Sequence, residues 1–267
     1  MNFPHIDPVI VSLGPIHLRW YGLMYVLGFV AAYILAGRQA GRVGWDAYLD
    51  KRDNLNLALI LGVILGGRLG YVLFYHPGYY LTHPLEIPAT WSGGMSFHGG
   101  CIGVLAAGFW YCRRAGLDYW KTADLYAPAV PIGLFFGRIG NFINGELFGR
   151  VSDVPWAMVF PEGGPLPRHP SQLYESFCEG LLLFVLLWFL KDKPWRRPAG
   201  RLWPHGSLLA CHLAGYGVMR FFLEYTREPD AHLGLLWLGF SMGQWLCLAT
   251  VAAGIGLWVW RSRLQFA

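Results

Sequence analysis

Long apolar stretches alternate with short polar ones along most of this chain. A membrane-spanning helix needs about 20 mostly apolar residues, and seven segments meet that requirement: 20–37, 55–75, 94–112, 123–143, 172–190, 206–225 and 235–260. The second, third, fourth and sixth are interrupted by Gly, Pro or charge, which is typical of helices that face protein or a cavity. The pattern predicts an all-α membrane bundle of seven transmembrane helices that forms one domain over residues 1–267.

Composition supports the same class of protein. Hydrophobic residues make up 55% of the chain and charged residues 14%, against a charged share of about 25% in soluble domains. These values exclude a disordered chain, a basic domain that binds nucleic acid and an ordinary cytosolic enzyme. The first 18 residues carry no Lys or Arg, so the positively charged start of a signal peptide is missing.

The five cysteines form no Cys-x-x-Cys pair and no cluster with histidine, and each falls in or beside an apolar stretch. They therefore predict small buried side chains rather than a disulfide framework or a zinc site. We expect no metal and no cofactor.

The positions of the basic residues indicate an orientation. Of the 21 Lys and Arg residues, fourteen lie after the first, third and fifth segments and in the C-terminal tail, and four lie in the opposite loops. Because Lys and Arg concentrate in cytoplasmic loops, we expect an outer N-terminus and a cytoplasmic C-terminus. The two long loops, 76–93 and 144–171, would then lie outside, and loops of such length are often functional.

Polar side chains that are costly to place in a bilayer gather at the predicted outer ends of six segments. They are Tyr21, Arg68, His98, Arg138, Asn141, Gln172, Glu175, Arg220 and Glu224. A charge at mid-bilayer costs about 2.5–3.5 kcal/mol, which favours a functional site over scattered accidents. Since the planar guanidinium suits phosphate oxygens, three arginines predict an anionic ligand such as a phospholipid head group. The alternative is that pairs such as Arg220–Glu224 and Arg138–Glu146 only tie helices together.

Two further side chains are open to more than one interpretation. His98 is the best candidate for a general base because imidazole titrates near neutral pH, but a membrane histidine can also be a simple hydrogen-bonding contact. Tyr21 could equally belong to the aromatic belt at the membrane surface.

Several motifs resemble one known family. Residues 137–150 read Gly-Arg-Ile-Gly-Asn-Phe-Ile-Asn-Gly-Glu-Leu-Phe-Gly-Arg, which resembles the signature of bacterial prolipoprotein diacylglyceryl transferases. The segments 20–25, 168–175, 215–220, 224–230 and 241–244 and the segment around His98 are similar to that family too, in family order. The similar segments extend over nearly the whole chain.

The resemblance implies a seven-span enzyme of the bacterial inner membrane, with its active site toward the outer side. Such enzymes transfer the diacylglyceryl unit of phosphatidylglycerol to the lipobox cysteine of a prelipoprotein, so that a thioether forms and glycerol phosphate leaves. The implied catalytic residues are His98, Arg138, Asn141, Arg220 and Glu224. The implied substrate-binding residues also include Tyr21, Glu146 and Gly149, and the layer of charged residues adds Arg68 as a candidate for substrate binding.

Other functions remain open at this point. Buried charge also occurs in transporters and channels, although here the charges lie at one predicted depth rather than along a route across the bilayer. Ser96 lies two residues from His98 and raises the alternative of an intramembrane serine protease, but the glycine that ends a nucleophile elbow is missing. Only the number of predicted spans supports the alternative of a receptor-like helical bundle.

Overall fold

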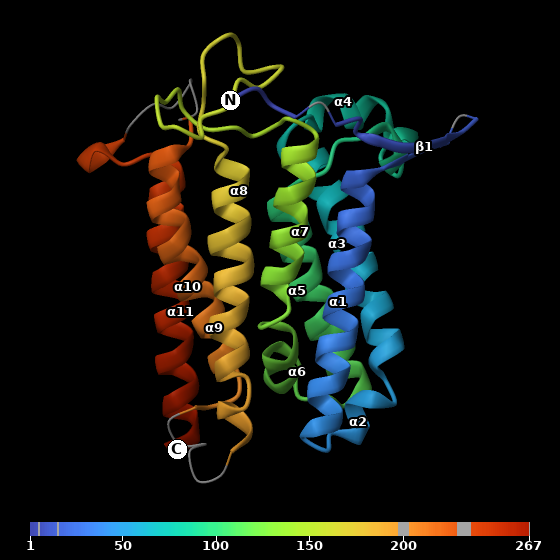
Figure 1. Ribbon diagram of the computed structural model, residues 1–267. Helices are drawn as coiled ribbons and strands as arrows, with labels where there is room; N and C mark the ends of the chain where they lie inside the picture. Colours follow the sequence, from blue (N-terminus) through green and yellow to red (C-terminus); the bar gives the residue numbers. More distant parts are fainter. Residues whose placement is uncertain (5, 15, 197–202, 229–235, 267) are drawn as a thin grey trace. The chain divides into compact units, whose positions relative to one another are not determined.

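The computed structural model describes residues 1–4, 6–14, 16–196, 203–228 and 236–266 (Figure 1). Several residues used in the sequence analysis lie outside these ranges: Arg197 and Arg201 among the fourteen basic residues, Pro229 and Asp230 of the motif 224–230, and the first residue of the predicted segment 235–260. The chain divides into two compact units, Met1–Ala36 with Ala123–Ala267, and Gly37–Thr122. The single membrane domain over the whole chain stays a prediction.

Most of the described chain is helical, as the pattern of apolar stretches predicts. The long helices are α1 (Trp20–Arg42), α3 (Arg52–Phe74), α5 (Phe97–Ala115), α10 (Ser207–Leu223) and α11 (Met242–Phe266). The fifth predicted segment forms a continuous helical run, in which α8 (Ser171–Glu175) passes into the π-helix η3 (Ser176–Leu182) and then into α9 (Leu183–Leu190). The all-α class is therefore confirmed.

Two predicted segments differ from the helices observed. Segment 123–143 is not one helix: α6 (Tyr119–Tyr126) ends and α7 (Val130–Ile143) begins after a short break. Pro128 and Pro131 explain the break, because proline disfavours helix in the residue before it and lacks a backbone N–H. The last segment becomes α-helical only at Met242, after the 3-10 turn η7 (Trp237–Gly239).

Four helices of the described chain are long and apolar enough to cross a membrane, namely Trp20–Arg42, Arg52–Phe74, Ser171–Trp195 and Met242–Leu264. Helix α7 is a shorter apolar helix, and α5 and α10 carry Gly, His or Arg within their apolar sequence.

The only sheet in the described residues is the hairpin of β1 (Val9–Leu13) and β2 (Ile16–Arg19). The two strands pair antiparallel, with Val11 opposite Leu18.

Within the unit Gly37–Thr122, glycines let α3 and α5 pack backbone against backbone. Gly62, Gly66 and Gly70 repeat every fourth residue of α3 and face Gly99 and Gly103 of α5. A Cβ at Gly66 would lie 2.6 Å from the Cα of Gly103, closer than real Cβ contacts allow. Small residues at this spacing are the usual basis of close helix contact in membranes. The same unit contains α2 (Asp46–Leu49), α4 (Pro77–Thr82), η1 (Pro84–Glu86) and η2 (Thr90–Ser92).

In the other unit, α10 packs along α11 (Figure 1). Gly254 of α11 approaches the backbone of Ala210 and Ala214 so closely that a Cβ there would lie 2.7 Å from the Ala210 carbonyl oxygen. Short 3-10 turns follow α9 and α10, at η4 (Lys193–Trp195) and η6 (Glu224–Thr226). Helices α7, α8–η3–α9 and α10 carry the side chains described next.

Candidate active site

The C-terminal half of α7 presents two of the predicted site residues. Arg138 and Asn141 lie three residues apart on this helix, so they share one face. Asn141 is 7% exposed, and the Arg138 side chain is 18% exposed. This face meets the beginning of the α8–η3 run, because Ser176 Oγ donates to the carbonyl of Phe135, one turn earlier in α7, at 3.1 Å.

Glu175, at the end of α8, is the centre of a buried ion-pair cluster. Its Oε2 lies 2.8 Å from Arg138 Nε. Its Oε1 lies 2.5 Å from Arg220 Nη1 and 3.2 Å from Arg227 Nη1. Glu175 is fully buried, whereas the three arginine side chains keep between 13% and 24% exposure. The carboxylate therefore lies behind the guanidinium groups and holds them together.

Two more carboxylates complete the cluster. Glu179 is also fully buried and lies 3.4 Å from Arg220 Nη1 and 3.8 Å from Arg138 Nη2. Glu224 lies 3.1 Å from Arg220 Nη2 and accepts a 3.1 Å hydrogen bond from Ser241 Oγ. Three arginines and three glutamates balance in charge, which lowers the cost of burying them together.

Two carboxylates reach the same arginines because Glu175 and Glu179 lie four residues apart on one helical run and share a face. Glu175 ends α8 and Glu179 lies inside η3, and a π-turn inserted in an α-helix is frequent at functional sites. Gly180 allows this turn to press against α7, since a Cβ there would lie 2.6 Å from the Cβ of Phe135. Glu179 was not among the residues predicted from the sequence, although two carboxylates four residues apart in an apolar segment are a visible signal.

A second network joins Tyr21, Asn141 and Glu146. Asn141 Nδ2 donates to Glu146 Oε1 at 2.8 Å, and Asn144 Nδ2 donates to the same oxygen at 3.2 Å. The Tyr21 hydroxyl hydrogen-bonds with Asn141 and lies 3.1 Å from the Tyr25 hydroxyl. Tyr21 is thus part of a polar network, which the aromatic-belt alternative does not require.

The two networks are adjacent because they share elements. Arg138 and Asn141 lie one turn apart on α7, and Gln172 and Glu175 lie one turn apart on α8. Gln172 Nε2 donates to the backbone carbonyl of Glu146 at 2.6 Å, which ties the loop after α7 to α8. Arg138 pairs with Glu175 and not, as the helix-tying alternative supposed, with Glu146.

Backbone bridges hold the loop that carries Gly149. Its N–H donates to the carbonyl of His169 at 2.9 Å, and it forms an antiparallel bridge with Arg227. A Cβ at Gly149 would lie 2.9 Å from the Cβ of His169 and would also meet the carbonyl of Thr226. The structure thus explains this glycine by close backbone packing, and its contact with substrate stays a prediction. The bridge also connects the loop to Arg227, which lies in the family-like segment 224–230 but was not among the predicted site residues.

The unit Gly37–Thr122 carries Arg68 and His98. Arg68 is 3% exposed and donates to the backbone carbonyls of Glu86, Ile87, Gly93 and Gly94. His98 is exposed in the first turn of α5, and its ring meets that of Phe97 edge-on at 5.7 Å. The roles of both residues in binding and catalysis stay predictions.

Ser96 has a structural task that the protease alternative does not need. It is the N-cap of α5, where its Oγ accepts the Gly99 N–H at 3.2 Å, and it is 7% exposed. This hydrogen bond is the standard way to satisfy a free N–H at a helix start. The position explains the serine without a nucleophilic role.

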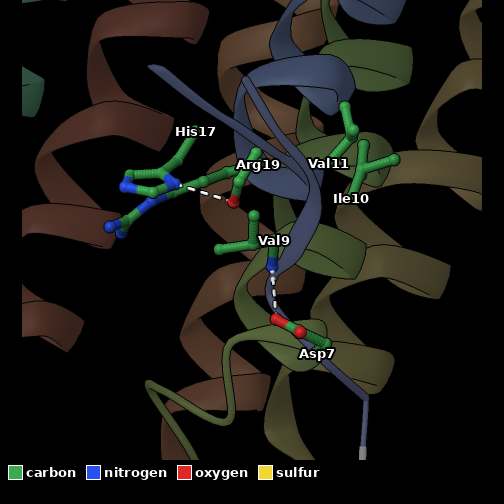
Figure 2. Close-up of a pocket in the computed structure, with 7 residues that line it drawn as sticks. Asp7, Val9, Ile10, Val11, His17 and Arg19 are labelled. Atoms are coloured by element: carbon green, nitrogen blue, oxygen red, sulfur yellow. Dashed lines mark hydrogen bonds between the residues drawn. The ribbon is translucent and has the colours of Figure 1, made fainter. Parts of the chain in front are cut away.

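Outside these networks, a shallow hollow lies at the N-terminal hairpin (Figure 2). Within it, Asp7 Oδ1 accepts the Val9 N–H at 2.8 Å, and Ser12 Oγ lies 2.8 Å from His17 Nδ1. The hollow is lined by Asp7, Val9, Ile10, Val11, Ser12, His17 and Arg19, none of which is a predicted site residue.

Among the described residues, no group of three or more His, Cys, Asp or Glu side chains is arranged to hold a metal ion.

All five cysteines are free thiols. Cys112 and Cys247 are buried as predicted, whereas Cys101 is exposed. The expectation of buried side chains is therefore wrong for Cys101. It lies on an exposed face of α5, whereas Gly99 and Gly103 face α3.

Comparison with known proteins extends the resemblance to nearly the whole chain. The family described as prolipoprotein diacylglyceryl transferase matches residues 8–260. A relative from Desulfotalea psychrophila is 55% identical over 260 residues, which cover 97% of this chain and 95% of the relative. A relative from Bordetella avium is 53% identical over 266 residues, with 98% and 97% covered. Both are named phosphatidylglycerol–prolipoprotein diacylglyceryl transferase. This chain therefore belongs to the prolipoprotein diacylglyceryl transferase family.

Proposed function

We propose that this protein transfers the diacylglyceryl group of phosphatidylglycerol to the lipobox cysteine thiol of prelipoproteins. The observation that carries the proposal is identity above 50% along nearly the full length of relatives that bear this activity in their name. The buried arginine–glutamate cluster supports it, because guanidinium groups are suited to a phosphodiester.

The reaction exchanges one bond at a glycerol carbon of the lipid. The cysteine sulfur attacks the carbon esterified to phosphate, a C–S bond forms and the C–O bond breaks. The electron pair of that bond leaves with glycerol phosphate, and the thiol proton is taken up by a base. The protein therefore has two tasks, namely deprotonation of the thiol and stabilisation of the charge that develops on phosphate.

Arg138 and Arg220 are our proposed phosphate clamps. Both are fixed by Glu175 and Glu179, and both keep part of the side chain accessible. Groups held in place before the reaction need no reorganisation as charge develops. Glu224 orients Arg220 through a 3.1 Å contact.

The neighbouring network gives a place for the glycerol or ester part of the lipid. Asn141 and Tyr21 are the proposed hydrogen-bonding groups there, and Glu146 orients the Asn141 amide through a 2.8 Å hydrogen bond. Gly149, whose backbone is bridged to His169 and Arg227, is a further proposed substrate-contact residue.

His98 is the proposed base, on the strength of imidazole chemistry and of the family resemblance. We expect His98→Gln to reduce turnover by about 100-fold or more, within the usual contribution of a general base. Full turnover by this variant would move the role to a carboxylate or to thiolate formed in solution.

We further propose seven membrane spans, an outer N-terminus, a cytoplasmic C-terminus and an active site toward the outer side of the bacterial inner membrane. The excess of Lys and Arg in alternate loops supports this orientation. Helices α5, α7 and α10 would then add to the four helices that meet the length and hydropathy of a span.

Purified protein, phosphatidylglycerol and a peptide with a lipobox cysteine provide the direct test. Mass spectrometry should find a diacylglyceryl adduct on the cysteine and release of glycerol phosphate. The proposal fails if no adduct forms although both substrates are shown to bind. A parallel assay for ion flux in liposomes should be negative. A transporter or channel would conduct ions in this assay, whereas the proposed transferase would not.

Arg138→Lys tests the phosphate clamp. Lysine keeps the charge but not the planar pair of donors, so we expect kcat/KM to fall by about 100-fold, or roughly 2.7 kcal/mol of transition-state stabilisation. Arg263→Lys near the C-terminus of α11 is the matched control. Unchanged activity of Arg138→Lys would remove the support for bidentate phosphate recognition.

A further inference from the structure

We propose that Arg68 is a positioning residue that fixes the segment leading to His98, rather than a ligand of the phospholipid. The inference rests on the proposed function for the role of His98, and its structural basis lies entirely within the unit Gly37–Thr122. Arg68 belongs to α3 and is 3% exposed.

Its guanidinium is committed to the chain itself. Nε donates to the carbonyl of Ile87 at 2.7 Å and Nη2 to that of Glu86 at 2.7 Å. Nη1 donates to the carbonyls of Gly93 and Gly94 at 2.6 and 3.2 Å. All three nitrogens of the group are therefore engaged with the segment from the end of η1 to the start of α5.

These donors tie the segment to α3, and only the Glu86 carbonyl among the four also accepts a described backbone N–H, that of Ala89 at 3.1 Å. One guanidinium can serve several backbone carbonyls because it carries five N–H donors in a rigid fork. Gly93 and Gly94 have φ of +84° and +78°, a left-handed conformation that glycine adopts readily. This local path turns both carbonyls toward one nitrogen of Arg68.

Aromatic rings enclose the same side chain. The guanidinium carbon lies 5.2 Å from the centre of the Tyr80 ring and 6.0 Å from that of Tyr71. Tyr80 of α4 is itself 9% exposed. Rings at this distance attract a cation and shield its hydrogen bonds from water.

The connection to His98 is short. Directly after the clamped glycines, the Ser96 N–H donates to the carbonyl of Gly67 at 2.8 Å, so α3 holds the segment through two consecutive residues. The Ser96 side chain then caps α5 through the Gly99 N–H at 3.2 Å. His98 lies in this capped first turn, and the direction of its imidazole depends on a segment that Arg68 and Gly67 fix.

Arg68→Gln and Arg68→Lys test the clamp in two measurements. In hydrogen exchange of the full-length protein in detergent, we expect the amides of residues 86–99 to exchange at least about tenfold faster in both variants, as for loss of roughly 1.4 kcal/mol of local protection. Arg113→Gln, an exposed arginine at the end of α5, should leave that segment unchanged. Unchanged exchange in both Arg68 variants would overturn the clamp.

Transfer kinetics then separate positioning from lipid binding. If Arg68 acts through His98, kcat should fall at least about tenfold while the KM for phosphatidylglycerol stays within about twofold. The double variant Arg68→Lys with His98→Gln should be no slower than His98→Gln alone, because one lost function cannot be lost twice. A raised KM with unchanged kcat, or multiplicative losses, would show direct contact with the lipid.

The two measurements distinguish failure of this inference from failure of the proposed function. If the wild-type protein transfers no diacylglyceryl group, the proposed function is wrong, and hydrogen exchange still reports on the clamp. If Arg68→Gln does not fold, Arg68→Lys retains the charge and several donors and carries both tests.

Discussion

Glu175 contacts three guanidinium groups although none of its side chain is exposed. Removing one partner of a buried ion pair leaves an uncompensated charge and costs about 3–5 kcal/mol. At the scale of single residues, the arrangement of Arg138, Arg220 and Arg227 therefore depends on a residue that need not touch the substrate.

We expect Glu175→Gln to lower both stability and transfer. The neutral amide cannot balance three arginines, so the free energy of unfolding should fall by about 3 kcal/mol and the guanidinium groups should separate. Thermal unfolding in detergent and the lipobox-peptide assay measure the two effects. Glu162→Gln, in an exposed loop position, is the control. A Glu175→Gln variant as stable and active as the control would contradict the central role of this carboxylate.

Part of this site was predicted from residue types and their spacing alone. The sequence placed Arg220 and Glu224 on one helix face, and they do pair. The partner of Arg138 was missed because Glu175 and Glu179 come from another helical run, which also contains the π-turn η3. No pattern within the segment itself signals that turn.

Among the elements, α3 and α5 depend on glycine for their close approach. We expect Gly66→Ala to lower the midpoint of thermal unfolding, because overpacking of a tight contact costs about 1–3 kcal/mol. Gly41→Ala is the matched control, since nothing lies within 4 Å of a Cβ built there. Equal unfolding midpoints for the two variants would mean that the helices can separate without cost.

Helix α10 has a capping residue that comes from elsewhere in the chain. Asp124 of α6 is 1% exposed, and its carboxylate accepts the N–H groups of Gly206 and Leu208 at 2.8 and 2.9 Å. A carboxylate at a helix N-terminus satisfies unpaired N–H groups and interacts favourably with the helix dipole. It thereby fixes the start of the helix that carries Arg220.

Asp124→Asn should weaken this cap by about 1 kcal/mol, in the usual range for caps, because the amide lacks the charge and offers one acceptor oxygen. Hydrogen exchange of residues 206–209 should become faster, with a smaller change elsewhere. Asp153→Asn, at an exposed position, serves as the comparison. Exchange that is identical in the two variants would show that α10 starts without help from α6.

For the whole molecule, the testable property is orientation in the membrane. A cysteine that replaces Glu162 should react with an impermeant maleimide in intact spheroplasts, and one that replaces Arg196 should react only in inverted vesicles. Both positions are exposed, so accessibility to the reagent depends on the side of the membrane. The opposite labelling pattern would reverse the proposed orientation, and wild-type protein corrects for the native cysteines.

The sequence by itself determined the helical class, the approximate extent of most helices and which residue types are suited to a phosphate ligand. Apolar length and charge are local properties, so they can be read without a fold. Only the tertiary structure decided that Glu175 joins three arginines and that Arg68 is bonded to backbone carbonyls. These features depend on contacts between residues distant in sequence, where packing and the pairing of buried polar groups choose the partners.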